Sequence, residues 1–388
     1  MARAALRIGL VANEPSGDLL GAALAAEILA LAPEARLVGV AGPQMLAAGC
    51  DTLFPLERLS VMGLTEVLGH LPELLRLRRQ LVRYFLAEPP AVFVGIDAPD
   101  FNLGLERRLR AAGIPTAHLV SPTVWAWRPG RVKGIRRAVD LMLCVFPFEE
   151  PFLRQHGVPA RFVGHPLADR IPMTVDRSSA RAALGLDAAG PLIALLPGSR
   201  AGEVSRLAAP FIETAVLCRR SRPELRFAVP LVNARLRALF ESELRRLAPD
   251  LPIRLIDGRS REVIAAADCV LTASGTATLE CLLLKRPMAV GYRVNALTYR
   301  LARWLVKVPY AAMANLLAGR ELAPEFLQDR CRAERMAPAL LAFLDEPERV
   351  AEIQAEYARI HAGMRHNAAR EAARAVLDLA GWSAPRSV

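Results

Sequence analysis

The chain alternates between short apolar runs and longer amphipathic segments along most of its length. Leucine-rich or β-branched runs predict strands near residues 6–12, 36–41, 91–96, 115–120, 140–145, 160–163, 191–196, 225–229, 252–256, 268–272 and 287–291. Between these runs apolar residues recur at spacings of three and four, as in 19–31 and 204–220, which predicts helices. Strands that alternate with helices form parallel sheets with right-handed crossovers.

Two breaks in this rhythm suggest how the chain is divided. The stretch 165–179 holds Pro166, Pro172 and mixed polar residues and is interpreted as a linker, and after about residue 320 the strand pattern stops. We therefore expect an α/β protein with two Rossmann-like doubly wound domains facing a cleft, followed by a helical tail. The expected domains are residues 1–170, 171–345 and 346–388. Ligands of such sheets bind at the carboxyl ends of strands, so residues directly after strands are the candidates for a site.

Composition excludes several classes of protein. Of the 388 residues 53% are hydrophobic and 23% charged, which suits a chain with a sizeable core and not a disordered one. The six cysteines form no CxxC pair, which indicates buried thiols in a reducing compartment and not a zinc site or a disulfide framework. The longest uncharged stretch, 111–127, contains two prolines, and no secretory signal is recognised. We expect a cytoplasmic protein without a membrane span, and no spacing of His, Asp and Glu calls for a metal or another cofactor.

The net charge of +11 points toward anions without identifying them. Between Arg107 and Arg137 there are eight basic residues and no acidic one. The charge is carried almost entirely by arginine, which can reflect genome composition alone. Its functional interpretation is an affinity for phosphates, nucleic acid or an acidic lipid surface.

The first predicted strand ends in a polar turn, Asn13 to Asp18. Ser16 or Asp18 could cap a helix beginning at Leu19, or contact a ligand. The turn is not the GxGxxG fingerprint of dinucleotide-binding proteins. Glu14 is harder to explain as a cap, because a carboxylate at a strand end faces the expected cleft, and we count it as a catalytic candidate.

A second carboxylate follows the strand 92–96. Asp97 comes directly after that strand, too early to cap a helix, and is the preferred candidate for a general base. Asp100 stands where it could cap a following helix predicted over residues 102–110.

Two loops in the second half have the composition of phosphate sites. Pro197 to Arg200 and Ala273 to Glu280 each join a strand to a helix through small residues. Free N–H groups and the positive end of the helix dipole favour a diphosphate at such places. Arg200 adds a fixed positive charge suited to a leaving phosphate. Glu280, one turn further, could hold the hydroxyl pair of a ribose.

Two other segments have an amphipathic character. In 61–86, leucines and Phe85 fall on one side of a predicted helix and three arginines on another, which is typical either of a helix at an anionic membrane surface or of a helix packed on a sheet. The loop from Ser121 to Arg128 combines two tryptophans with a basic run and suits an amphipathic ligand.

Together these motifs resemble the lipid-A-disaccharide synthases, a family of bacterial glycosyltransferases. The matching stretches occur in order between residues 13 and 321 and are 16–18, 60–63, 97–102, 121–128, 163–166, 195–200, 274–280 and 315–321.

The resemblance implies a glycosyltransferase fold of the B type. Residues 1–170 would then form the acceptor-binding and membrane-facing domain, residues 171–345 the UDP-sugar-binding domain, and residues 346–388 the helices that cross back to the first domain. It implies an inverting, metal-independent transfer from UDP-2,3-diacylglucosamine to 2,3-diacylglucosamine 1-phosphate, which gives a β-1,6-linked disaccharide and UDP. It also implies a peripheral enzyme of the cytoplasmic face of the inner membrane, with homodimers built by exchange of C-terminal elements. Carried onto this chain, the base is Asp97, the diphosphate site is Arg200 with the loop 274–276, Glu280 is a ribose ligand and Asn315 is a further nucleotide contact. Taken with the candidates from the residues themselves, the expected catalytic residues are Asp97 and Glu14, and the expected substrate-binding residues are Ser16, Asp18, Asn102, Trp125, Arg128, Ser199, Arg200, Ser274, Gly275, Thr276, Glu280 and Asn315.

Three other functions remain as alternatives. A UDP-sugar epimerase would share the fold and the diphosphate loops but would not need an amphipathic membrane helix. A membrane-associated nucleotide binder without catalysis would keep the loops and tolerate loss of Asp97. A nucleic-acid binder is disfavoured, because no recognised nucleic-acid motif accompanies the basic run.

Overall fold

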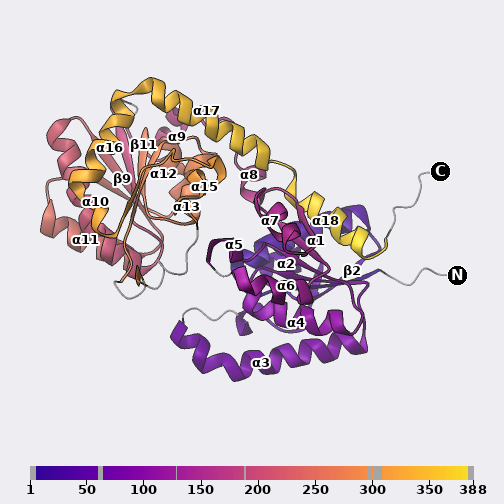
Figure 1. Ribbon diagram of the computed structural model, residues 1–388. Helices are drawn as coiled ribbons and strands as arrows, with labels where there is room; N and C mark the ends of the chain where they lie inside the picture. The colour runs from indigo at the N-terminus through magenta and orange to yellow at the C-terminus, as the bar shows by residue number, and fades with distance from the viewer. Residues whose placement is uncertain are drawn as a thin grey trace. The chain divides into compact units, whose positions relative to one another are not determined.

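The chain folds into two compact units, each built on a parallel sheet. A computed structural model describes residues 6–59, 64–127, 129–187, 189–295, 299–300 and 308–382. Unit 1 contains residues 1–169 and 364–388, and unit 2 contains residues 170–363 (Figure 1). The predicted fold class, two parallel α/β domains with a helical C-terminal tail, is confirmed.

Unit 1 is organised around a seven-stranded sheet in the order β3-β2-β1-β4-β5-β6-β7, with every neighbouring pair parallel. Helices cover both faces, so a central strand such as β4 is a continuous apolar run without alternation, and all five of its residues are buried. The strands are β1 Arg7–Ala12, β2 Arg36–Val40, β3 Cys50–Thr52, β4 Val92–Ile96, β5 Thr116–Leu119, β6 Leu141–Cys144 and β7 Ala160–Phe162.

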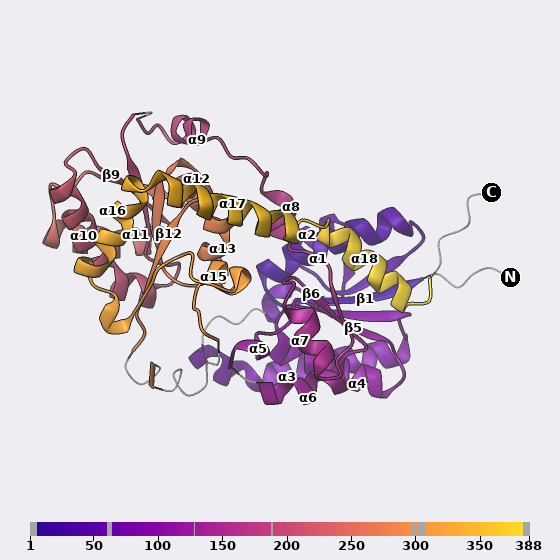
Figure 2. The same cartoon turned by 45° about the horizontal axis from the view of Figure 1, so that its top comes forward.

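Helices α1, α2 and α18 lie on one face of this sheet, and α3, α4 and α6 on the other (Figures 1 and 2). The α-helices of this part of the chain are α1 Pro15–Leu31, α2 Pro43–Ala47, α3 Leu64–Ala87, α4 Pro99–Ala111, α5 Val124–Trp127, α6 Val132–Ala138, α7 Glu149–Gln155, α8 Pro166–Arg170 and α18 Ala368–Leu379. The last of these packs against α1, and its alanines and Val376 are part of the core of unit 1.

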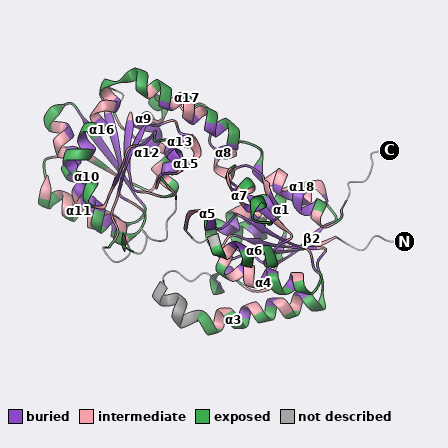
Figure 3. Ribbon diagram, in the orientation of Figure 1, coloured by how far each residue is buried: buried purple, intermediate pink, exposed green. Residues whose placement is uncertain are grey.

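Helix α3 packs on the sheet through its C-terminal half. Leu77, Leu81 and Phe85 are fully buried, and the Phe85 and Phe93 rings meet edge to face with centroids 5.2 Å apart. A Cβ atom on Gly9 of β1 would lie 3.0 Å from the Phe85 ring, so glycine permits this close packing. Of the two interpretations that the sequence left open for this segment, Phe85 fits a helix packed on a sheet and not a helix at a membrane surface. Figure 3 shows that exposed positions of α3 line its other side.

Unit 2 repeats the architecture with a six-stranded sheet in the order β10-β9-β8-β11-β12-β13, again parallel throughout. The strands are β8 Leu192–Leu196, β9 Arg226–Leu231, β10 Ile253–Asp257, β11 Cys269–Thr272, β12 Met288–Tyr292 and β13 Glu325–Leu327. Helices α10, α11 and α16 cover one face, and α9, α12 and α13 the other (Figure 1). The helices are α9 Arg177–Ala183, α10 Ala201–Ser221, α11 Ala234–Leu247, α12 Ser260–Ala266, α13 Thr276–Leu283, α15 Met313–Ala318, α16 Ala333–Asp345 and α17 Pro347–Met364.

The structure differs from the prediction made from the sequence in three respects. Strands β3 and β13 were missed, and the expectation that strands stop near residue 320 is wrong. Both are three-residue strands at the edge of a sheet, too short to give a periodic signal. The stretch 165–179, predicted as a linker, contains α8 and the start of α9. Unit 2 extends to Gly363, so α16 and nearly all of α17 belong to it, whereas the sequence placed its end at residue 345.

Candidate active site

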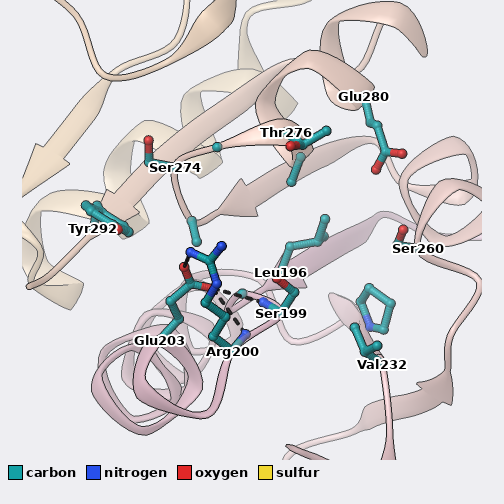
Figure 4. Close-up of a pocket in the computed structure, with 15 residues that line it drawn as sticks. Leu196, Ser199, Arg200, Glu203, Val232, Ser260, Ser274, Thr276, Glu280 and Tyr292 are labelled. Carbon is teal, nitrogen blue, oxygen red and sulfur yellow. Dashed lines mark hydrogen bonds and ion pairs between the residues drawn. The ribbon is translucent and has the colours of Figure 1, made fainter. Parts of the chain in front are cut away.

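A cavity of about 400 Å³ opens in unit 2 at the carboxyl ends of β8 and β11 (Figure 4). Its wall is formed by the two loops that the sequence assigned to a diphosphate, together with residues at the carboxyl ends of β9 and β12 and the first residue of α12. Six of the predicted substrate-binding residues line it: Ser199, Arg200, Ser274, Gly275, Thr276 and Glu280. The structure thus brings together residues that are up to 81 positions apart in the chain.

The loop after β8 is closed by a carboxylate that the sequence analysis did not single out. Glu203, in the first turn of α10, accepts hydrogen bonds from the N–H groups of Ser199 (3.0 Å) and Arg200 (3.2 Å). Gly198 has a φ of +115°, and a Cβ atom there would lie 2.5 Å from the Glu203 carboxylate. These two N–H groups are therefore already paired, which leaves the side chain of Arg200 as the positive group of this loop. Its side chain is 84% exposed, with Nη1 3.8 Å from Glu203 Oε1 (Figure 4).

The loop after β11 keeps its donors available. Gly275 precedes α13 with φ +113° and ψ −152°, a conformation essentially restricted to glycine. No side chain caps α13, and within the described part of the chain the N–H groups of Thr276 and Ala277 have no acceptor. Two unpaired donors at the positive end of a helix dipole form an anion site.

A partly buried network of hydrogen bonds holds this loop in place. Ser274 Oγ donates to the carbonyl of Ala311 (3.0 Å), and the Glu325 carboxylate accepts from the N–H groups of Ala311 (2.8 Å) and Ala312 (2.9 Å). Asn315 Nδ2 donates to the same carboxylate (2.8 Å). Glu325 escaped the sequence analysis because it is a single acidic residue in the short strand β13.

Asn315 has no hydrogen-bonding capacity left for a nucleotide. The side chain is fully buried, its amide donates to Ala323 and Glu325, and its carbonyl accepts from the N–H groups of Leu322 and Ala323. All four positions of the amide are used by the protein. These contacts favour a positioning role for Asn315 rather than the direct contact that the resemblance implies.

Glu280 reaches the cavity already paired. Its carboxylate accepts a hydrogen bond from Arg261 Nε at 2.8 Å and is largely buried, whereas Arg261 is nearly half exposed. A ribose that contacts Glu280 would therefore also meet Arg261, which the sequence gave no reason to select.

In unit 1, the carboxylate preferred as the base lies on a strained piece of backbone. Asp97 and Ala98 both adopt the left-handed conformation, with φ of 52° and 43°. Each such non-glycine residue costs on the order of 1–3 kcal/mol, and such residues concentrate at functional sites. The Asp97 N–H donates to Leu119 O (2.9 Å), and its carbonyl accepts from Asn102 Nδ2 (2.9 Å). The turn is thus held from β5 and from α4.

Asn102 and Asp100 both differ from their predicted roles. Fully buried Asn102 directs its amide at the carbonyls that end β1 and β4, so its contacts favour positioning of Asp97 over substrate binding. Helix α4 begins at Pro99, three residues before the predicted start, because proline suits the first helical position. The capping role proposed for Asp100 is therefore wrong. Its side chain is 85% exposed in the first turn of α4 and pairs with Arg131.

In the turn after β1 the predicted residues Glu14 and Ser16 are exposed, whereas Asp18 is buried. Helix α1 begins at Pro15 and not at Leu19, so neither Ser16 nor Asp18 caps it. Glu14 takes the N-cap position, without a side-chain cap bond, and both Glu14 and Ser16 are exposed. Since β1 pairs with β4, Glu14 and Asp97 follow neighbouring strands of the sheet.

Asp18 has a structural partner instead. Its buried carboxylate accepts from the N–H groups of Gly42 (2.9 Å), Gln44 (2.9 Å) and Met45 (3.0 Å), which lie at the N-terminus of α2. A Cβ atom at Gly42 would lie 2.6 Å from this carboxylate. These contacts favour a role for Asp18 in holding α2 against α1.

Trp125 is anchored to a buried acid. Its indole N–H donates to Glu149 (3.2 Å), which also accepts from the N–H groups of Val145 (3.2 Å) and Phe146 (3.1 Å). The rings of Trp125 and Phe148 meet edge to face at 4.7 Å. Arg128 and the segment 60–63 lie outside the described residues.

The Glu149 carboxyl should make the stability of unit 1 depend on pH. Burial raises the pKa of Glu149 from 4.5 to about 7, although three hydrogen bonds oppose the rise. Because the folded state holds the proton more tightly than the unfolded chain, the contribution of Glu149 to the free energy of unfolding is fully present below pH 4.5. It falls as the pH rises from 4.5 through 7.

Glu149→Gln removes this titration. We expect the melting temperature of the variant relative to wild type to increase between pH 5 and pH 8, by the equivalent of about 1–3 kcal/mol. Melting curves at intervals of half a pH unit measure it. A difference between the two proteins that stays constant over this range would contradict the raised pKa.

Neither a metal centre nor a membrane span is found among the described residues. No three side chains of His, Cys, Asp or Glu converge in a way that could hold a metal ion in this part of the chain. No helix within the described ranges is both long enough and apolar enough to cross a bilayer.

Comparison with solved structures places the fold among enzymes that handle nucleotide sugars. UGT2 of Phytolacca americana, solved with UDP-2-fluoro-glucose and pterostilbene, aligns with a TM-score of 0.61 at 13% identity, over 96% of this chain and 99% of that one. The UDP-GlcNAc 2-epimerase of Neisseria meningitidis, solved with UDP-GlcNAc, aligns with a TM-score of 0.60 at 11% identity, over 96% and 99%. At these identities the likeness shows the fold alone.

Comparison of sequences is far more specific. The lipid-A-disaccharide synthase of Azotobacter vinelandii is 54% identical over 377 residues, which are 97% of this chain and 98% of the relative. That of Pseudomonas aeruginosa (strain UCBPP-PA14) is 53% identical over 374 residues, which are 96% and 98%. The family model described as lipid-A-disaccharide synthetase matches residues 8–379. The chain therefore belongs to the lipid-A-disaccharide synthase family.

Proposed function

We propose that this protein joins UDP-2,3-diacylglucosamine to 2,3-diacylglucosamine 1-phosphate, giving the β-1,6-linked lipid A disaccharide 1-phosphate and UDP with inversion at the donor carbon. Membership of the family supports disaccharide synthesis. The observation that carries the donor half is the cavity of unit 2, which is lined both by the N-terminal residues of α13, whose N–H groups have no acceptor among the described residues, and by Arg200.

Bond cleavage places negative charge on the departing UDP. The N–H groups of Thr276 and Ala277 and the guanidinium of Arg200 supply positive potential there, so the reaction as proposed uses no metal. Ser274 and Asn315 contribute indirectly, because they hold the loop after β11 in place. Glu280, together with Arg261, binds the ribose.

Bond formation needs a base for the 6-hydroxyl of the acceptor. A sugar hydroxyl is too weak an acid to react as the alkoxide at neutral pH, so a carboxylate takes its proton as it attacks the anomeric carbon of the donor. We assign this step to Asp97, whose strained backbone is held by Asn102 and β5. Glu14, after the neighbouring strand, is the second candidate.

One assay separates this function from its alternatives. The purified protein is incubated with both diacylated sugars in detergent, with and without EDTA, and disaccharide and UDP are quantified by mass spectrometry. Equal release of disaccharide and UDP in both conditions supports the proposal. Epimerised UDP-GlcNAc would identify an epimerase, and UDP binding without transfer would identify a nucleotide-binding protein.

We further propose that unit 1 docks peripherally on the anionic cytoplasmic face of the inner membrane through α3. Leu71 is 44% exposed and Leu75 36%, and Arg76, Arg79 and Arg83 are exposed on the same helix. Exposed leucines beside arginines are typical of helices at anionic lipid surfaces.

Changing Leu71 and Leu75 together to serine should weaken binding to phosphatidylglycerol vesicles about tenfold or more, because each leucine contributes about 1.5–3 kcal/mol when buried in an apolar phase. Leu46→Ser is the matched control, since Leu46 is 47% exposed on α2. Vesicle sedimentation gives the two affinities, with melting temperatures as a check on folding. Equal affinities of the double variant and wild type would place the membrane contact elsewhere.

A further inference from the structure

Unit 2 contains another cavity, which has no role in the reaction proposed above. Its volume is about 780 Å³, and we call it the arginine cavity because four arginines line it: Arg206, Arg293, Arg300 and Arg332. Within the described part of the chain Asp329 is the one carboxylate on its wall. Four guanidinium groups against one carboxylate leave the cavity strongly positive.

The arginines come from separate segments of the chain, and two of them are held in place by hydrogen bonds to backbone carbonyls. Arg206, on α10, donates to Gly202 O at 2.6 Å, and Arg293, directly after β12, donates to Cys331 O. None of the four forms an ion pair with a carboxylate of the described residues, Asp329 included. Their charge is therefore not neutralised by the protein.

Helix α10 and the end of β12 contribute residues to both the nucleotide cavity and the arginine cavity: Glu203 lines the first, and Arg206, one helical turn later on α10, lines the second. Tyr292 lines the nucleotide cavity and Arg293, the next residue, lines the arginine cavity. Burial and the charge of Glu203 raise the pKa of Tyr292, whereas the charges of Arg200 and Arg206 lower it.

We propose that the arginine cavity binds a phosphate monoester, and that this ligand is the 1-phosphate of the acceptor sugar. Guanidinium groups bind phosphate oxygens through paired N–H donors, and a cluster of them suits the double charge of a monoester. The diphosphate of the donor already has its own site at α13. The identity of the acceptor rests on the proposed function, whereas the phosphate site rests on the arginines alone.

The first test measures binding without catalysis. The full-length protein, saturated with UDP to occupy the nucleotide cavity, is titrated calorimetrically with glucosamine 1-phosphate. Arg293→Gln combined with Arg332→Gln should raise its Kd by about 10- to 100-fold, because hydrogen bonds to charged groups are among the stronger ones and two are removed. UDP affinity should not change, and melting curves check that the variant remains folded after the loss of the hydrogen bond from Arg293 to Cys331.

The matched control removes two arginines from the same unit away from the cavity. Arg220 is exposed on α10, and Arg254 is exposed on β10, at the sheet edge opposite β13. Arg220→Gln combined with Arg254→Gln should bind glucosamine 1-phosphate like wild type. Equal weakening by both double variants, or wild-type affinity in the cavity variant, would overturn the proposal.

The second test separates the acceptor from a phospholipid headgroup as the source of the phosphate. In detergent micelles wild type should have a lower KM for 2,3-diacylglucosamine 1-phosphate than for the sugar without phosphate, and the cavity variant should lose this preference. If the variant keeps the preference but no longer binds phosphatidylglycerol vesicles, the cavity contacts lipid and the proposal is wrong. If wild type transfers no sugar yet binds glucosamine 1-phosphate only with the cavity intact, the proposed function fails and the phosphate site stands.

Discussion

Asp97→Asn should lower kcat by about 10²- to 10⁴-fold while leaving folding and UDP affinity unchanged. The amide keeps the size of the side chain but cannot accept the proton of the acceptor hydroxyl. The hydrogen bonds that fix the turn use the backbone of Asp97, from its N–H to Leu119 and from Asn102 to its carbonyl, so the substitution leaves them in place. Single-turnover rates at saturating substrates measure the loss, with UDP titration and melting curves beside them.

Two neighbouring carboxylates provide matched controls. Asp100→Asn changes a group that is 85% exposed, so the lost ion pair with Arg131 should cost at most about 1 kcal/mol and little activity. Glu14→Gln tests the carboxylate after the adjacent strand. If either control is the inactive variant and Asp97→Asn retains turnover, the base has been assigned to the wrong residue.

The sheets could be predicted because burial leaves a simple mark on the sequence. Strands such as β4 and β8 are covered on both faces, so every position is apolar and the run stands out from the helices around it. β3 and β13 lie at sheet edges with three residues each, and their contacts depend on strands far away in the chain. No local pattern marks such segments.

The predicted starts of α1, after β1, and of α4, after β4, were both too late, and the cause is the same in each helix: a proline in the first turn. Pro15 and Pro99 occupy the first turn of α1 and α4, whereas the sequence analysis placed each start three or four residues later. With the correct starts, Asp18 and Asp100 move from cap positions into the helices. Asp18 then caps the neighbouring helix α2, a contact across 24 positions of sequence that no spacing rule anticipates.

Residues of the nucleotide cavity that directly follow a strand could be predicted from the sequence. Residues that only hold the loops of the cavity in place could not. Gly275 and Thr276 stand out as a small-residue loop before a helix. Glu203 and Glu325 do not, because their function is to accept N–H groups of loops that only the folded chain brings to them. Their burial and contacts identify them, and the sequence alone shows two ordinary acidic residues.

Arg200 is the positive group whose loss should cost most in this cavity, because the N–H groups of its own loop are occupied by Glu203. Charge on the leaving diphosphate grows as the sugar bond breaks, so a contact from this guanidinium strengthens in the transition state. By analogy with the loss of one oxyanion donor, Arg200→Ala should cost roughly 2–4 kcal/mol of transition-state stabilisation. That corresponds to about 30- to 1,000-fold in kcat/KM.

The structure makes Arg200→Ala a clean substitution and supplies its control. Glu203 accepts from the backbone N–H of Arg200, which alanine retains, and the side chain is 84% exposed, so the start of α10 and the melting temperature should not change. Arg200→Lys keeps the charge but loses the planar pair of donors, and it should recover part of the activity. Steady-state kinetics with varied donor, beside UDP titrations, distinguish the three proteins. Near-normal kcat/KM together with normal UDP affinity in Arg200→Ala would remove this arginine from the site and leave the leaving group to the N–H donors of α13 alone.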